Sequence, residues 1–212
     1  MDIDKTTLDD LSVFRHGEEI AVADKLDRCT TTHGSEQLRI NFSTALKTQE
    51  EVMAIQQTLK LILHYQAQWP RTISNGTVMV VEKYFDSNIS SIPSNPSSWQ
   101  AYMYKLLHGP DYALVTYSAK HCFDFIKGFQ QLLELFSGKE LPAPMKRLLD
   151  NVRHAIDKPQ FAVVARHKNA DSLSRPQLLH LAHFIRYHYK HHMHDLVVWY
   201  AQLDAWYGMA MA

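Results

Sequence analysis

The sequence has few of the residues from which several classes of functional site are built. Its 212 residues include only two cysteines, Cys29 and Cys122, which are too far apart in sequence for a zinc pair or a disulfide framework. A reducing, cytoplasmic location is therefore expected. No apolar run approaches the roughly 18 residues of a membrane-spanning helix, and the acidic N-terminus does not resemble a secretory signal. We therefore expect no membrane association.

The chain also lacks an excess of charge of either sign. Lys and Arg together number 22, as do Asp and Glu. A dedicated nucleic-acid-binding domain usually carries a basic excess, so we expect any binding of DNA to be weak and sensitive to salt. Hydrophobic residues make up 46% and charged residues 21%, which is ordinary for a globular protein and excludes disorder of the chain as a whole. The length suits one domain or a closely packed pair.

The motifs of several enzyme classes are missing. There is no G-x-S-x-G, and the one Gly-Lys pair, Gly138-Lys139, has Glu140 after it and no glycine at the start of the loop. We therefore expect no catalytic residue and no nucleotide cofactor within this chain. Six of the 13 histidines lie between residues 180 and 194, and His188 and His192 have the spacing that lets two imidazoles share a metal. No third ligand accompanies them, so packed or solvated histidines are favoured over a metal site.

Helical periodicity, in contrast, is abundant. Thr48 and Glu51 fit a capping box, and a 3-4-3 apolar stripe follows from Val52 to Ile62. Gly138 stands where a long helix would end. Helices are predicted over 18–29, 35–44, 48–62, 99–108, 111–137 and 144–157.

The most regular pattern lies near the C-terminus. Behind Ser174 and Pro176, apolar or semi-apolar residues recur at spacings of 3 and 4 from Leu178 to Trp206. This pattern predicts one helix of roughly 30 residues, about 45–50 Å long. The fold predicted from the sequence is all-α: a helical bundle core with one long C-terminal lever helix.

Three segments do not share this periodicity. Residues 77–85 suit a strand as well as a short buried helix, and residues 161–165 suit an extended segment. Residues 86–98 hold six Ser, two Pro and two Asn, which favours a solvated linker. It would divide an N-terminal helical part (1–85) from the helical bundle and lever helix (99–212).

The stretch from Leu8 to Leu46 resembles the opening of the core domain of MutS-family DNA mismatch-repair ATPases. The family pattern L-[DN]-x-T-x-T-x-x-G-x-x-x-L-R appears here as L-D-R-C-T-T-T-H-G-S-E-Q-L-R over residues 26–39. Cys29 replaces the first Thr of that pattern, and Ala45 stands where Pro is common. The segment Leu203-Asp204-Ala205, followed by Met209-Ala210, resembles the end of the family's lever helix, which leads into the ATPase domain. The resemblance gives structural roles to Leu26, Asp27, Thr31, Gly34, Leu38, Arg39 and Leu46.

This resemblance implies a non-catalytic core and lever module that couples a downstream ATPase domain to DNA or to a partner. The full protein would then bind ATP and Mg²⁺ beyond residue 212 and would be a homodimer. The mismatch-reader domain is missing, and about 16 residues stand between 157 and 174, where the family's clamp would need on the order of 100. Mismatch repair as the biological role is therefore in doubt. The alternative is a stand-alone helical interaction scaffold with no nucleotide or DNA role.

A further expectation concerns the C-terminal aromatic residues. Trp199, Leu203 and Trp206 continue the apolar stripe. If an ATPase domain normally covers them, they form an exposed surface in this chain, through which it would self-associate.

Overall fold

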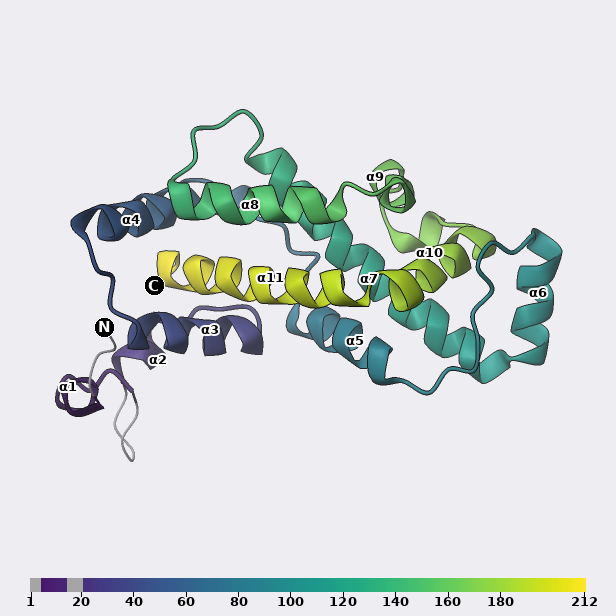
Figure 1. Ribbon diagram of the computed structural model, residues 1–212, viewed down its shortest axis with the longest axis horizontal. Helices are drawn as coiled ribbons and strands as arrows, with labels where there is room; N and C mark the ends of the chain where they lie inside the picture. The colour runs from purple at the N-terminus through teal and green to yellow at the C-terminus, as the bar shows by residue number, and fades with distance from the viewer. Residues whose placement is uncertain (1–4, 15–20) are drawn as a thin grey trace. The chain divides into compact units, whose positions relative to one another are not determined.

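The computed structural model describes residues 5–14 and 21–212, and these residues form an all-α structure (Figure 1). No β-strand occurs within the described residues, so the all-α prediction is confirmed. The chain divides into two compact units. The first comprises residues 1–69, 138–150 and 197–212, and the second comprises 70–137 and 151–196. The Ser-rich segment 86–98 therefore lies inside the second unit, which differs from the division expected from the sequence.

The first unit is assembled from three separate stretches of chain. Thr31 caps one of its helices by accepting a hydrogen bond from the Gly34 amide, and Thr48 caps the next by accepting one from Glu51. The Glu51 carboxylate accepts from the Lys47 amide rather than from Thr48 itself, so the expected capping box is only half formed. The helices of this unit are α1 (Lys5–Asp10), α2 (Val22–Leu26), α3 (Thr32–Ser43), α4 (Gln49–His64), the start of α8 (Ala143–Ile156) and most of α11 (Lys190–Ala210), together with the short η1 (Gln66–Gln68).

The predicted helix over 18–29 is observed only as α2, and its residues 18–20 lie outside the described residues.

The second unit is organised around α7 (Gly109–Leu135), which buries one face completely through Val115, Phe123, Phe125, Ile126, Phe129 and Leu132, while Tyr117 on another face is exposed. Helices α5 (Asn75–Asp86) and α10 (Arg175–His188) pack against it. A methyl group on Gly128 would meet Ile73 side-chain carbons at under 3 Å, so glycine at this position lets the segment before α5 approach closely. The remaining elements are α6 (Ser98–Leu107), η2 (Pro159–Phe161), α9 (Ala162–Arg166), η3 (Ala170–Ser172), the end of α8 and the first turns of α11.

Both segments with ambiguous or extended patterns are helical. Residues 77–85 lie within α5, capped by Ser74, with Val78 and Val81 buried. Residues 161–165 belong to η2 and α9 rather than to an extended segment. Burial against neighbouring helices outweighs the weak strand preference of β-branched residues here.

The long C-terminal helix is not continuous, which corrects the prediction of a single lever helix. Helix α10 ends at His188, and α11 begins at Lys190. Tyr189, between them, has φ −129° and ψ 9°, and its hydroxyl donates a hydrogen bond to the Ala155 carbonyl. Its ring also packs edge-on against Phe161 at 5.0 Å. This tertiary contact interrupts the helix, although the apolar periodicity continues through it.

The Ser-rich segment is held in place rather than solvated throughout, which corrects the linker interpretation. Ile89 and Ile92 are buried. The Tyr104 hydroxyl donates to the Ser91 carbonyl at 2.8 Å, and the Arg186 guanidinium donates to the Ser87 carbonyl at 2.6 Å. The backbone of this segment therefore has fixed partners on α6 and α10.

Candidate functional site

The carboxylate of Asp204, near the end of α11, is a buried group of the first unit that accepts several hydrogen bonds. Its Oδ2 accepts from the Thr31 hydroxyl at 2.7 Å and from the Thr31 amide at 2.8 Å. Its Oδ1 accepts from the Thr30 hydroxyl at 2.8 Å and from the Thr30 amide at 3.0 Å. The Asp204 side chain is 0% exposed. We call this set of residues, with Gly34, the Asp204 corner.

The local sequence explains why the corner forms where it does. Thr31 has extended backbone angles and caps α3: its hydroxyl accepts from the Gly34 amide and donates to Asp204, and its own amide also donates to Asp204. Gly34 faces the same carboxylate, and a Cβ atom there would lie 2.7 Å from Asp204 Cγ. Glycine at 34 is therefore required by close approach to Asp204 rather than by an unusual backbone angle.

A second close contact lies beside the corner. A Cβ atom on Gly208 of α11 would lie 2.8 Å from the Cys29 backbone nitrogen. The Asp27 carboxylate accepts from that same Cys29 amide at 3.0 Å. Burial, followed by the hydrogen bond to Asp27, raises the pKa of the Cys29 thiol far above its ordinary value. The thiol therefore stays protonated at neutral pH and is a poor nucleophile.

The Asp204 carboxylate accepts hydrogen bonds from two neighbouring residues, Thr30 and Thr31. Burial raises the pKa of the neighbouring Tyr200 hydroxyl. The arrangement fastens the last turns of α11 to the start of α3.

The structure brings together some of the residues to which the resemblance gave structural roles. Thr31 and Gly34 lie in the Asp204 corner, and Leu38 is fully buried behind it. Arg39 forms an ion pair at 3.1 Å with Asp24 on α2. Leu46, in contrast, is exposed after the end of α3. Leu26 is half-buried, so it contributes less to the core of the corner than expected, and Asp27 turns back to the Cys29 amide.

Asp204 belongs to the segment Leu203-Asp204-Ala205 near the end of α11, and the sequence pattern by itself indicates no role for it. The signal was a carboxylate on an otherwise apolar stripe between Leu203 and Trp206. A buried carboxylate requires hydrogen-bond donors nearby, and the consecutive Thr residues supply them.

The expected exposed surface at the end of α11 is not present. Leu203 is fully buried and Trp206 is only 6% exposed, while Trp199 is half-buried. Nearby, Trp69 stacks on Tyr207 with ring centroids 5.0 Å apart. The prediction that these residues are uncovered is therefore wrong for Leu203 and Trp206, which are buried.

The histidines near residue 188 do not gather into a metal site. Within the described part of the chain, no group of three or more His, Cys, Asp or Glu side chains is placed to hold a metal ion. His192 stacks on Tyr189 at 4.7 Å, and His188 stacks on Phe184 at 6.3 Å. Burial, followed by the nearby His188, lowers the pKa of His183. His188 and His192 are therefore exposed rings that each stack on an aromatic neighbour.

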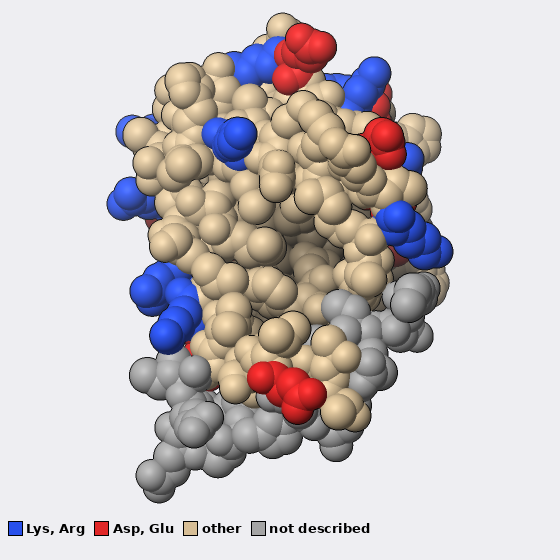
Figure 2. All heavy atoms as spheres, turned by 90° about the vertical axis from the view of Figure 1, so that its left-hand side faces the viewer, with Lys and Arg blue, Asp and Glu red and all other residues tan. Residues whose placement is uncertain are grey.

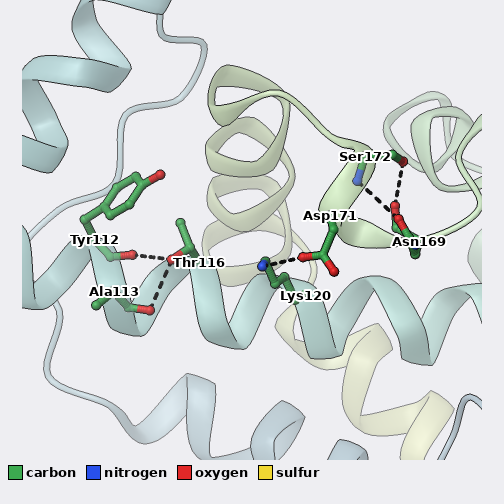
Figure 3. Close-up of polar contacts among 7 residues, drawn as sticks. All are labelled: Tyr112, Ala113, Thr116, Lys120, Asn169, Asp171 and Ser172. Atoms are coloured by element: carbon green, nitrogen blue, oxygen red, sulfur yellow. Dashed lines mark hydrogen bonds and ion pairs between the residues drawn. The ribbon is translucent and has the colours of Figure 1, made fainter.

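A shallow groove of about 410 Å³ runs along the first half of α7 in the second unit. Figure 3 shows its polar contacts: Thr116 donates back to the Tyr112 carbonyl at 2.8 Å, and Lys120 pairs with Asp171 at 2.6 Å. The second lysine of the groove, Lys105, lies over the Tyr112 ring at 5.7 Å. Because one of the two cations is already neutralised, the groove is a weak candidate for phosphate binding.

Charged side chains are scattered on the face that Figure 2 shows: Lys and Arg (blue) and Asp and Glu (red) lie toward the periphery, while the hollowed centre is uncharged. The densest basic run, residues 166–168, begins at the end of α9 and continues into the following loop. Among the described helices, none has the length and apolarity needed to cross a membrane.

Comparisons with known proteins add no relative. No family model, no curated protein and no solved structure matches this chain.

Proposed function

We propose that this chain is the helical core and lever region of a MutS-like ATPase. In this proposal it is a non-catalytic module that couples an ATPase domain, located after residue 212, to DNA or to a partner. ATP and Mg²⁺ would bind in that later domain, and the working form would be a homodimer.

The observation that carries the proposal is the Asp204 corner. The resemblance rests on two segments, residues 26–39 and residues 203–210, which are far apart in sequence. The Asp204 carboxylate joins them directly through Thr30 and Thr31. The proposal is supported because two distant segments that each resemble the same family hydrogen-bond to each other here.

The corner also provides a physical route for coupling. Asp204 lies close to the end of α11, and Thr31 and Gly34 lie in the cap and first turn of α3. A domain attached after residue 212 that displaced the end of α11 would displace the start of α3 with it, because the contact is buried and close-packed.

The first test is the coding sequence that follows codon 212. The proposal requires a G-x-x-x-x-G-K-[ST] sequence within roughly one domain length, about 200 codons. A stop at codon 213, or a continuation with no phosphate-binding loop, would refute the proposal and leave the helical interaction scaffold as the function to pursue.

The second test measures coupling in the full-length protein. Asp204→Asn should retain basal ATP hydrolysis but lose most of its response to duplex DNA, offered as homoduplex and as mismatched duplex. Asp195→Asn, at an exposed position on the same helix, is the matched control and should respond as the wild type does. An Asp204→Asn protein with an unchanged DNA response would show that the corner does not couple the two sites.

A further inference from the structure

Asn75 is followed by Gly76 at the start of α5, and this pair differs from the other asparagine positions of the chain. The chain has six asparagines, and only Asn75 has glycine after it. Each of the other five precedes a residue that carries a Cβ atom: Phe42, Ile89, Pro96, Val152 or Ala170. An asparagine loses its side-chain amide when the next backbone nitrogen attacks it, and a Cβ atom beside that nitrogen hinders the approach. Glycine removes this hindrance.

The surroundings of Gly76 leave its backbone nitrogen accessible. Gly76 is exposed, and the atom nearest to a Cβ atom built on it is Ser74 Oγ, at 3.7 Å. It is the second residue of α5, and the first N–H groups of a helix have no carbonyl acceptor within that helix. The Ser74 hydroxyl accepts from the next amide along, that of Thr77, at 3.2 Å. The Asn75 side-chain nitrogen donates to Met79 Sδ at 3.6 Å, and sulfur is a weak acceptor.

We propose that Asn75 is a site of spontaneous deamidation. The Gly76 nitrogen attacks Asn75 Cγ, the new N–Cγ bond closes a succinimide ring, and the side-chain amide leaves as ammonia with the proton that Gly76 loses. Water then adds to one of the two ring carbonyls and opens the ring. Opening at one carbonyl gives aspartate with the normal peptide link. Opening at the other gives isoaspartate, in which the chain runs through Cβ and Cγ. The net reaction consumes water, releases ammonia and changes no oxidation state.

Opening of the first turn of α5 limits the rate of this reaction. In a helical backbone the nitrogen of one residue is held away from the side-chain carbon of the residue before it, so the ring closes only when the turn opens. Helix ends open most readily. Here the turn is closed by the Ser74 cap and by the hydrogen bond from the Val78 amide to the Ser74 carbonyl, at 3.1 Å. Ser74 therefore controls how often Asn75 reaches the reactive geometry.

The two products have different effects on α5. Aspartate at position 75 places a negative charge in the first turn, where the helix dipole favours it. Isoaspartate adds a carbon atom to the backbone between Ser74 and Thr77, so the cap no longer meets the same amide. Thr77 and Val78 are buried, and α5 packs against α7. Isoaspartate therefore loosens a turn whose residues belong to the core of the second unit, whereas aspartate preserves it.

Peptide mapping tests the site. The full chain is incubated in mildly alkaline buffer and digested with trypsin, which cleaves after Arg71 and Lys83 and so releases residues 72–83. Asn75 should convert about tenfold faster than Asn88, which is exposed and lies outside the helices but precedes a β-branched residue. The converted peptide should contain both aspartate and isoaspartate, identified by co-elution with synthetic standards. Conversion no faster than at Asn88 would overturn the proposal. So would conversion to aspartate alone, since direct hydrolysis of the side chain makes no isoaspartate.

Two variants separate the chemistry from the fold. Gly76→Ala should fold as the wild type does, because its methyl group meets no atom closer than 3.7 Å, and should convert about tenfold more slowly. Ser74→Ala loses the cap and should convert about fivefold faster, because the first turn opens more often. A wild-type rate in Gly76→Ala would refute attack by the Gly76 nitrogen. A wild-type rate in Ser74→Ala would refute control by the first turn.

Hydrogen exchange tests the consequence for α5. Aged protein, separated from unreacted protein by its added negative charge, contains both products and should show a population whose amides at 77–79 exchange faster. Asn75→Asp is the aspartate product made directly, and it should exchange these amides as the wild type does. Aged protein with wild-type exchange at 77–79 would show that isoaspartate leaves the turn closed, which contradicts the expected loosening.

Discussion

Replacing Asp204 should destabilise the first unit more than any other single change to a charged residue of α11. Asp204→Ala would leave the Thr31 amide and hydroxyl without their acceptor, and Thr31 is only 3% exposed. Each buried donor left without an acceptor lowers the free energy of unfolding by about 1–3 kcal/mol, so the two donors of Thr31 alone should lower it by about 2–6 kcal/mol. The donors of Thr30 add less, because that residue is exposed and its groups can turn to water.

Two further variants give this estimate a graded test. Asp204→Asn keeps the shape and one acceptor oxygen, but its amide nitrogen would face the donors of one of the two threonines. We therefore expect the asparagine variant to lower the free energy of unfolding by about half as much as the alanine variant, or about 2 kcal/mol. Asp195→Asn, at an exposed position, should change the free energy of unfolding by less than about 0.5 kcal/mol.

Urea unfolding followed by tryptophan fluorescence is the appropriate assay. Three of the four tryptophans, Trp69, Trp199 and Trp206, belong to the first unit, so the signal reports mainly on the unit that contains the corner. Circular dichroism at 222 nm would follow both units together. If the free energy of unfolding of Asp204→Ala lies within about 1 kcal/mol of the wild-type value, the Asp204 corner does not hold α11 to α3.

Four other substitutions address three separate features. Gly34→Ala should lower the free energy of unfolding by about 2–4 kcal/mol in the same urea titration, because the new methyl group would push Asp204 aside. Gly76→Ala is the control: its methyl group would meet no atom closer than 3.7 Å, so the free energy of unfolding should be unchanged or higher. Trp206→Glu should destabilise by about 3–5 kcal/mol in thermal unfolding, because the residue is buried; a folded variant with unchanged stability would contradict that burial. Arg186→Met should raise the hydrogen-exchange rate of amides in 87–92, since the guanidinium fixes the Ser87 carbonyl; unchanged exchange there would show that the segment is held by other contacts.

Local chemistry was sufficient to predict much of the fold. Thr48 caps α4 as expected, because an N-cap depends only on the capping side chain and on the backbone amide three positions later, here that of Glu51. Gly138 follows α7 with a φ of 69°, the left-handed angle that favours glycine. In both cases the information lies within a few residues, so a sequence pattern can carry it.

Features fixed by distant contacts could not be predicted in this way. The break at Tyr189 depends on the Ala155 carbonyl, 34 positions away, while the apolar spacing runs through it without change. Residues 77–85 have a valine-rich pattern that suits two structures, and only packing against α7 selects the helix. The role of Asp204 required knowing which donors a buried carboxylate would meet.

The Asp204 corner also constrains how the protein can be made. Thr30 and Asp204 are 174 positions apart. At the 5–20 residues per second of protein synthesis, Thr30 leaves the ribosome roughly 10–35 seconds before Asp204 does. During that interval the start of α3 has no acceptor for its capping threonines, and the first unit lacks its last helix. This unit therefore cannot assemble fully until Asp204 has been synthesised, and a transcript truncated before codon 204 would yield a chain in which the first unit cannot close.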